Sequence, residues 1–288
     1  MTIRTILGAT SGGTASQGAI ELACRLARRF GAHLEGFHVR VDPYAVFAAA
    51  GEDFVSTGEL FESIVAEGAA TAAATQAAFA AATAGHEIPH RAMPQFAAPH
   101  EHRPSACWRE ETGYAPALVP ARARFFDLVV LGRSGRVVSA PYTDTIEQTL
   151  ARSGRPVLLA PADPPPGIGD RVALAWNGSP QAVRSVVAAL PFLEKAGKVS
   201  VITVGDRDTG GGLSLVDHLA WHGIAAAHRH LPPGGANIGE KLLAAAAADA
   251  ADLLVMGGYG HAPWREYVLG GATREVVGAS LIPLLLAH

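Results

Sequence analysis

The sequence predicts an α/β protein made of two tandem doubly wound domains of the flavodoxin-like or Rossmann-like type, each with a five-stranded parallel sheet. Two observations predict this fold class. Short apolar runs alternate with longer amphipathic or alanine-rich stretches, which is the pattern of βα units around a sheet that is buried on both faces. The pattern also occurs twice along the 288 residues of the chain, a length that suits one large or two small domains. We expect the two copies to pack together as an internal pseudo-dimer.

The repeat is clearest around the fourth strand expected in each copy. Residues 126–135 read FDLVVLGRSG and residues 251–260 read ADLLVMGGYG, so each stretch is an aspartate, an apolar run and the pattern G-x-x-G. Further on, PVLLA at 156–160 matches PLLLA at 283–287. Self-similarity at a fixed spacing marks a repeated structural unit. The chain is therefore predicted to be a tandem duplication.

The two copies are predicted to occupy residues 1–161 and 170–288. Their first strands match as well, because residues 5–12 parallel residues 172–179, each a short apolar run that leads into a small polar turn. Between the copies lies the proline-rich segment 161–169, which favours an extended and fairly stiff linker. The first copy is the longer one, chiefly through a long helix and a loop rich in proline and histidine.

Each apolar run is assigned to a strand and each longer stretch to a helix. In the first copy we expect strands near 4–9, 34–40, 107–110, 127–131 and 156–160, and a helix near 58–84. In the second copy we expect strands near 171–176, 199–204, 225–231, 252–256 and 282–287, with helices at 179–195, 213–222, 237–249 and 271–279. The last strand of each copy should contact the other, because an unpaired apolar edge must be covered.

Composition excludes several classes of function. The formal net charge is −3, from 23 Lys+Arg against 26 Asp+Glu, so the sequence carries no basic footprint for nucleic acid. The alanine-rich stretch at 68–86 is too weakly apolar to span a membrane. The first residues lack the long apolar core and cleavage site of a signal peptide, and the two cysteines form no disulfide framework. We therefore expect a cytoplasmic protein.

The turn after the fourth strand of the second copy has the residues of a phosphate site. Open parallel sheets bind ligands at the carboxyl ends of their strands. Here Gly257 and Gly260 are followed by nine residues and then by Gly270 and Gly271 at the start of a helix. Glycines let the backbone approach a phosphate closely, and the exposed N–H groups of a helix start hold an anion.

This spacing resembles the nucleotide-binding signature of the universal stress protein family, which is G-x-x-G, nine residues, then G-S/T. The turn WNGS at 176–179 is similar to the first-strand turn of that family, usually Asp-Gly-Ser. The resemblance covers both copies and therefore implies the tandem two-domain form. It further implies a stress-response protein that binds an adenine nucleotide, ATP, with or without Mg²⁺.

The resemblance also implies which residues bind. Asn177 would contact the nucleoside, the backbone at Val204 would meet adenine, and the glycine loop would hold the phosphates. The full set implied by position is Asn177, Val204, Met256, Gly257, Gly260, Gly270, Gly271, Ala272 and Thr273.

The chain departs from the family pattern at several positions. Gly271 stands where the family has Ser or Thr, which removes a hydroxyl donor, and Asn177 stands for Asp, which removes a charge. In the first copy the glycine loop is followed at the nine-residue spacing by Thr145 and Ile146, and the first turn reads TSGG at 10–13. We expect no nucleotide site in the first copy.

No catalytic arrangement or metal site is assigned. The twelve histidines form no recognised zinc signature, and no serine has an identifiable base. The protein is therefore expected to be a sensor or binder rather than an efficient enzyme, with at most slow ATP hydrolysis or autophosphorylation, for which Thr273 is a candidate acceptor.

Two further interpretations stay open. One is an interaction module in which both sites are vestigial and residues 42–105 of the first copy bind a protein or a small apolar molecule. The other concerns assembly, since two chains could form a homodimer in addition to the internal pseudo-dimer.

Overall fold

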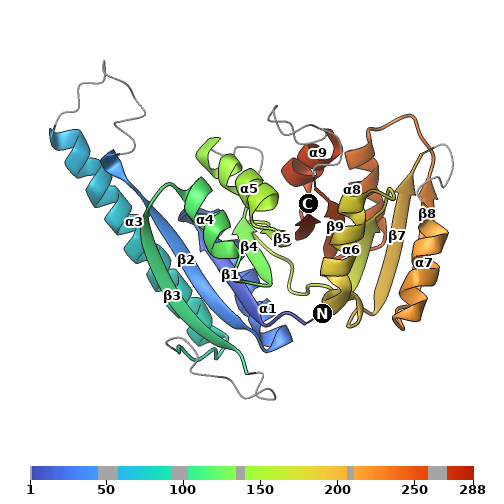
Figure 1. Ribbon diagram of the computed structural model, residues 1–288, viewed down its shortest axis with the longest axis horizontal. Helices are drawn as coiled ribbons and strands as arrows, with labels where there is room; N and C mark the ends of the chain where they lie inside the picture. Colours follow the sequence, from blue (N-terminus) through green and yellow to red (C-terminus); the bar gives the residue numbers. More distant parts are fainter. Residues whose placement is uncertain (1, 45–57, 92–102, 134–139, 206–210, 259–270) are drawn as a thin grey trace. The chain divides into compact units, whose positions relative to one another are not determined.

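The computed structural model describes residues 2–44, 58–91, 103–133, 140–205, 211–258 and 271–288. The chain divides into two compact units, a first unit of Ile3–Arg155 and a second unit of Pro156–His288. Each unit is a mostly parallel sheet with helices on both faces (Figure 1). The expected α/β fold class is confirmed.

Within its described residues the first unit has four parallel strands in the order β3-β2-β1-β4. Helices α1 and α3 cover one face, and α4 and α5 cover the other. The elements are β1 (Thr5–Thr10), α1 (Gly13–Phe30), β2 (His33–Val41), α3 (Gly58–Gly85), β3 (Ser105–Gly113), α4 (Ala115–Ala123), β4 (Leu128–Gly132) and α5 (Ala140–Arg152).

The described residues of the second unit form six strands in the order β5-β10-β9-β6-β7-β8, and among them β5 alone is antiparallel to its neighbour. Helices α6 and α7 lie on one face, and α8 and α9 lie on the other. The elements are β5 (Val157–Ala160), β6 (Arg171–Ala175), α6 (Pro180–Leu193), β7 (Lys198–Val204), α7 (Gly212–Trp221), β8 (Ala226–Leu231), α8 (Ile238–Ala248), β9 (Leu253–Gly257), α9 (Gly271–Ala279) and β10 (Leu284–Ala287).

The pairing expected between 156–160 and 282–287 is present. Strand β5 runs antiparallel to β10, with Leu159 opposite Leu284 and Val157 opposite Leu286. All four residues of β10 are buried, so this pairing covers an apolar strand that would otherwise form an edge. Strand β5 thereby groups with the second unit, although it is the last strand of the first sequence repeat. The limits 1–161 and 170–288 for the two domains stay a prediction.

The structure corrects the alignment of the two first strands by one residue. Ile6 pairs with Leu128, and Val172 pairs with Leu253. Because Leu128 and Leu253 are equivalent in the sequence repeat, Ile6 is the counterpart of Val172, whereas the sequence comparison had matched it to Ala173. The turns agree with the new alignment. Gly12 and Gly178 become equivalent, and both have positive φ, 88° and 72°, a conformation that glycine adopts without strain.

The aspartate that precedes the fourth strand has the same structural role in both units. One carboxylate oxygen of Asp127 accepts hydrogen bonds from the backbone N–H groups of Arg4 and Thr5, at 2.8 and 3.0 Å. The Asp252 carboxylate accepts from the N–H groups of Gly169 and Arg171, at 2.8 and 3.1 Å. Hydrogen bonds to an ionised acceptor are stronger than neutral ones. The aspartate thus fixes the start of the first strand beside the fourth.

The glycine that ends the fourth strand permits a close approach of helix to sheet. A Cβ atom on Gly257 would lie 2.7 Å from the backbone nitrogen of Ala182, in the first turn of α6. In the first unit a Cβ on Gly132 would overlap the carbonyl oxygen of Ala15, in the first turn of α1. Neither backbone can move aside without shifting its helix. Both positions therefore require glycine.

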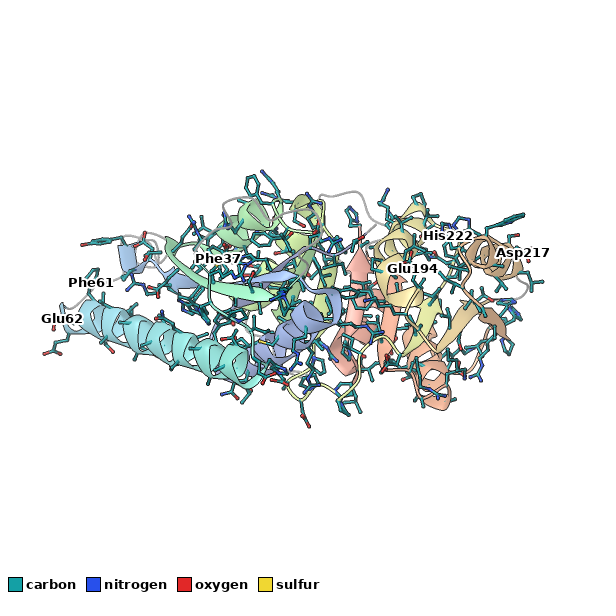
Figure 2. All side chains as sticks on the ribbon, turned by 90° about the horizontal axis from the view of Figure 1, so that it is seen from below. Phe37, Phe61, Glu62, Glu194, Asp217 and His222 are labelled. Atoms are coloured by element: carbon teal, nitrogen blue, oxygen red, sulfur yellow. The ribbon has the colours of Figure 1, made fainter. Side chains whose placement is uncertain are left out.

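Helix α3 is the long helix that the sequence predicts, and it packs on the first sheet. A Cβ on Gly36 would lie 2.7 Å from both Phe79 of α3 and Trp108 of β3, so the helix is closely seated there. Towards its start the helix is more exposed, and Phe61 and Glu62 lie at that end in Figure 2. Within the residues that the structure describes, no helix combines the length and apolar character needed to cross a membrane.

Replacing Gly132 by Ala should lower the free energy of unfolding by about 1–3 kcal/mol, because the added methyl group overpacks the contact with Ala15. A matched control is Gly68→Ala in the middle of α3, where a Cβ would meet no atom within 4 Å. That change should raise stability by about 0.5–1 kcal/mol. Urea unfolding followed by circular dichroism measures both effects. Equal behaviour of the two variants would contradict the proposed close approach.

Asp249 should make stability depend on pH in the acid range. Burial alone would raise the pKa of its carboxyl, but hydrogen bonds from Lys198 and Ser200 and the charge of Arg229 outweigh burial and lower this pKa below its ordinary value of 3.8. A carboxyl with a lowered pKa stabilises the fold above its ordinary pKa, and this contribution is lost as the pH falls through the folded value.

The change Asp249→Asn should therefore cost about 1 kcal/mol at pH 7, a modest value because Lys198 and Arg229 are 42% and 40% exposed. The difference from the unsubstituted protein should shrink below pH 4. Thermal unfolding across this range tests the prediction, with Asp217→Asn on the exposed face of α7 as the control. A difference that stays constant down to pH 2.5 would rule out this role for Asp249.

Candidate functional site

The second unit has a cavity of about 360 Å³ at the carboxyl ends of β6, β7 and β9. This is the end of a parallel sheet at which α/β proteins bind ligands. Helices α8 and α9 and the turn after β6 complete the walls. The lining residues are Ala175, Trp176, Asn177, Ser179, Gln181, Ile202, Val204, Ile238, Leu242, Met256, Gly257, Gly271, Ala272 and Thr273.

The structure brings together seven of the nine residues that the sequence analysis assigned to binding. They line this one cavity and come from four separate parts of the chain: Asn177, Val204, Met256, Gly257, Gly271, Ala272 and Thr273. The other two, Gly260 and Gly270, lie outside the described residues. The use of this set for nucleotide binding stays a prediction.

The turn after β6 is held by its own side chains. Asn177 Oδ1 accepts a hydrogen bond from the N–H of Ser179 at 3.1 Å. Ser179 is the N-cap of α6, and its hydroxyl oxygen accepts from the N–H of Ala182 at 3.2 Å. An N-cap of this kind satisfies one of the N–H groups that the first turn of a helix leaves without a helical acceptor. Asn177 therefore shapes the turn in addition to lining the cavity.

Helix α9 directs its first turn at the cavity. The helix begins at Gly271, and Gly271, Ala272 and Thr273 are all lining residues. The N–H groups of a first helical turn have no helical acceptors and carry the positive end of the helix dipole. A Cβ added at Gly271 would meet no atom within 4 Å, so there is room for a side chain where the family pattern has Ser or Thr.

The cavity has no charged side chain in the part of its lining that the structure describes. An anion would be held there by backbone N–H groups and by the hydroxyls of Ser179 and Thr273. No described lining residue is an acid or base that could activate water. The arrangement therefore fits binding better than turnover.

Apolar residues of α8 form a wall that the sequence analysis did not assign to the site. Ile238 and Leu242 are four residues apart, which places them on one face of the helix, and both line the cavity, as does Ile202 of β7. Ile238 is 52% exposed and Leu242 is 5% exposed. Such a spacing also occurs on any helix packed on a sheet, so the pattern did not indicate that these residues line a cavity. Trp176, which also lines this cavity, was expected only as part of the turn.

Histidines do not gather into a metal site among the described residues. Thr203 Oγ1 lies 2.9 Å from His228 Nε2 and 3.2 Å from His230 Nδ1. The rings of His218 and His222 contact each other on α7, with centroids 4.9 Å apart. Each pair is thus engaged in a local contact, and the expectation of no metal site stays a prediction.

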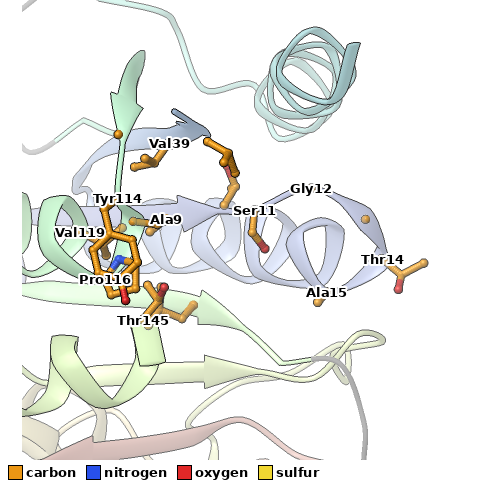
Figure 3. A pocket seen from close by; sticks show the side chains of 16 residues that line it. Ala9, Ser11, Gly12, Thr14, Ala15, Val39, Tyr114, Pro116, Val119 and Thr145 are labelled. Carbon is orange, nitrogen blue, oxygen red and sulfur yellow. The ribbon is translucent and has the colours of Figure 1, made fainter. Parts of the chain in front are cut away.

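The first unit has a cavity in the equivalent place, with a volume of about 540 Å³ (Figure 3). Leu131, the residue before Gly132, is the counterpart of Met256, and Val39 is the counterpart of Val204 by strand register. The lining residues are Ala9, Thr10, Ser11, Gly12, Gly13, Thr14, Ala15, Val39, Val41, Gly113, Tyr114, Ala115, Pro116, Val119, Leu131 and Thr145.

Solved structures resemble this chain over its whole length. A universal stress protein from Archaeoglobus fulgidus superposes with a TM-score of 0.69 at 14% identity, and the match covers 98% of this chain and 97% of that one. A putative universal stress protein from Pseudomonas aeruginosa gives 0.57 at 12% identity, covering 99% and 93%. The chain therefore has the universal stress protein fold, as the sequence resemblance implied.

A universal stress protein solved in complex with cAMP matches 41% of this chain and 97% of its own, at 19% identity and a TM-score of 0.34. No protein-family profile and no curated protein matches the sequence.

Proposed function

We propose that this chain, with its universal stress protein fold, is a cytoplasmic stress-response protein that binds one adenine nucleotide, ATP, in the cavity of the second unit. The observation that supports this most directly is the convergence of seven sequence-assigned residues on one cavity at the carboxyl end of the sheet. These residues come from the ends of β6, β7 and β9 and from the start of α9, so their meeting in one cavity does not follow from their being close in the sequence.

The cavity offers different chemistry to the different parts of a nucleotide. Val204 at the end of β7 and Leu242 of α8 supply apolar contact for the flat base, as binding pockets commonly do. Asn177 supplies a polar side chain for the sugar. The first turn of α9 supplies N–H donors for the phosphates.

The proposed role is that of a sensor, in which the bound state changes the affinity for a partner. No described residue of the lining is a carboxylate or a histidine. Mg²⁺ accompanying ATP would be held mainly by phosphate oxygens and water, the ligands that it commonly keeps. Without an assigned base or arginine, any hydrolysis should be slow.

The direct test is to place a carboxylate at the start of α9. Ala272→Glu should weaken ATP binding at least about tenfold, because the added charge repels the phosphates. Glutamate in a first helical turn suits the helix dipole, so the fold should survive. Titration calorimetry on the full chain measures the affinity, and Trp176 provides a fluorescence signal inside the cavity.

The matched control is Ala279→Glu, at the other end of the same helix, where the residue is exposed and outside the cavity lining. It should leave ATP affinity within about twofold of the unsubstituted protein. Equal loss in both variants, or no loss in Ala272→Glu, would refute the assignment of this cavity. The absence of binding at millimolar ATP in the unsubstituted protein would refute nucleotide binding itself.

A gain of affinity is expected from Gly271→Ser. This change restores the hydroxyl that the family signature places at the helix start, at a position with open space for a side chain. A hydrogen bond to a charged acceptor should tighten ATP binding by about threefold to tenfold. Gly278→Ser in the same helix, also in open space, should have no effect. Unchanged affinity in Gly271→Ser would show that the phosphates do not approach this residue.

A further inference from the structure

Strand β8 is the outermost strand of the second unit, and a further strand can reach its outer edge. On its inner side β8 pairs with β7, with Val199 opposite Ala226 and Val204 opposite Leu231. Among the described residues no strand follows β8 in the sheet (Figure 1). The strand is six residues long and contains no proline, one of the devices by which proteins block pairing at a sheet edge.

One hydrogen bond shows which backbone groups of β8 face this edge. The carbonyl oxygen of Leu231 accepts the N–H of Gly205 at 3.0 Å, so the backbone groups of Leu231 point towards β7. Successive residues of a strand direct their N–H and C=O groups to alternate sides of the strand. Because the pairing with β7 is continuous over 226–231, the backbone groups of Ala226 and His230 point outwards.

An open groove of about 430 Å³ lies between β8 and α8. One wall is formed by Arg229 and Leu231 of β8, and α8 contributes Lys241 and three alanines. Alanine has no side-chain atom beyond Cβ, so this part of the helix leaves space above the sheet. The side chains of a strand added beside β8 would find room there.

The described lining of this groove carries two positive side chains, Arg229 and Lys241, and no acidic one. Arg229 pairs with Asp249 at 3.2 Å, but the same carboxylate oxygen also accepts from Lys198 at 3.0 Å. One negative charge therefore faces two positive ones. Lys241 donates to the carbonyl oxygen of Pro232, which leaves two of its three N–H groups for a ligand. This excess of positive charge favours an acidic partner over a basic one.

We propose that the edge of β8 is a docking site for an extended acidic segment of a partner protein, which joins the sheet as a further strand and directs carboxylates at Arg229 and Lys241. In strand addition the main-chain hydrogen bonds give affinity, and pockets for alternate side chains give specificity. Every second residue of the segment would stand over the groove. A second copy of this chain fits poorly, because two adjacent β8 strands would bring like charges together.

The test uses two peptides that differ only in the sign of their charge. One alternates threonine with glutamate and the other alternates threonine with lysine, each over about eight residues, which is enough to span the strand. Each peptide carries a fluorophore and is titrated into the full chain while its anisotropy is followed. The acidic peptide should bind once per chain with a dissociation constant below about 1 mM. The basic peptide should bind at least about tenfold more weakly.

Two matched substitutions in α8 locate the site. Ala244→Glu puts a carboxylate into the groove, and Ala247→Glu puts the same group on the same helix outside the groove lining. Both positions are exposed and glutamate is a good helix former, so both variants should fold, which circular dichroism verifies. Ala244→Glu should weaken binding of the acidic peptide at least about tenfold. Ala247→Glu should change it less than about twofold.

Amide hydrogen exchange measured by NMR distinguishes strand addition from attraction by charge alone. The N–H groups of Ala226 and His230 point outwards and should exchange quickly in the free chain, whereas those of Ala227 and Arg229 point to β7 and should exchange slowly. Saturation with the acidic peptide should slow exchange at Ala226 and His230 at least about tenfold. Exchange at Ala227 and Arg229 should change little.

The proposal fails if the basic peptide binds as tightly as the acidic one, if the two alanine variants behave alike, or if the outward amides stay unprotected in the complex. Sedimentation of the chain without peptide tests the other occupant, since a dimer that Ala244→Glu dissociates would assign the edge to a second copy and overturn the proposal. ATP affinity is measured in the same samples. It should be unchanged in Ala244→Glu, so a failure of this inference is separable from a failure of the nucleotide site.

Discussion

The contact between the end of the fourth strand and the first turn of the first helix determines how each unit is built. Gly132 and Gly257 let the backbones of α1 and α6 come closer to the sheet than any side chain would permit. Because neighbouring residues of a strand point to opposite faces, the preceding residues, Leu131 and Met256, point to the other face and line the cavities. Two consecutive residues of the strand therefore determine the position of the helix on one face of the sheet and a wall of the cavity on the other face.

The two units share this framework and differ in the residues that line their cavities. The first strand of each unit is held at its start by an aspartate, Asp127 or Asp252. Helices α5 and α9 are each followed by a serine, Ser153 or Ser280, whose hydroxyl accepts a backbone hydrogen bond. The two helices contribute differently to the cavities. In the second unit Gly271, Ala272 and Thr273 of α9 line the cavity, and in the first unit the described lining contains Thr145 of α5. Cavity chemistry can therefore diverge while the sheet and the helix packing stay constant.

Sequence alone predicted the strand and helix pattern because buried parallel strands are short apolar runs. It underestimated β3, which was expected at 107–110 and spans Ser105–Gly113. The residues that extend the strand are Ser105, Ala106, Glu111, Thr112 and Gly113, which form no apolar run. Two ion pairs, Arg109 with Glu111 and Arg40 with Glu110, lie along this edge strand. The one-residue shift of the first turn was missed because similarity of residue types matched Gly12 to Ser179. Backbone conformation instead matches Gly12 to Gly178, since both have positive φ. The contribution of α8 to the cavity wall was also missed, because Ile238 and Leu242 have the sequence pattern of residues that pack a helix on a sheet.

Neither cavity has a charged side chain in its described lining, so the preference of each for an ion or a neutral molecule depends on groups that carry only partial charge and on charges just outside. In the second unit the first turn of α9 supplies partial positive charge. In the first unit the first turn of α1, at Gly13, Thr14 and Ala15, lines the cavity and supplies partial positive charge in the same way. Each unit thus places the start of a helix beside apolar walls at the carboxyl ends of its strands, although different helices supply that start.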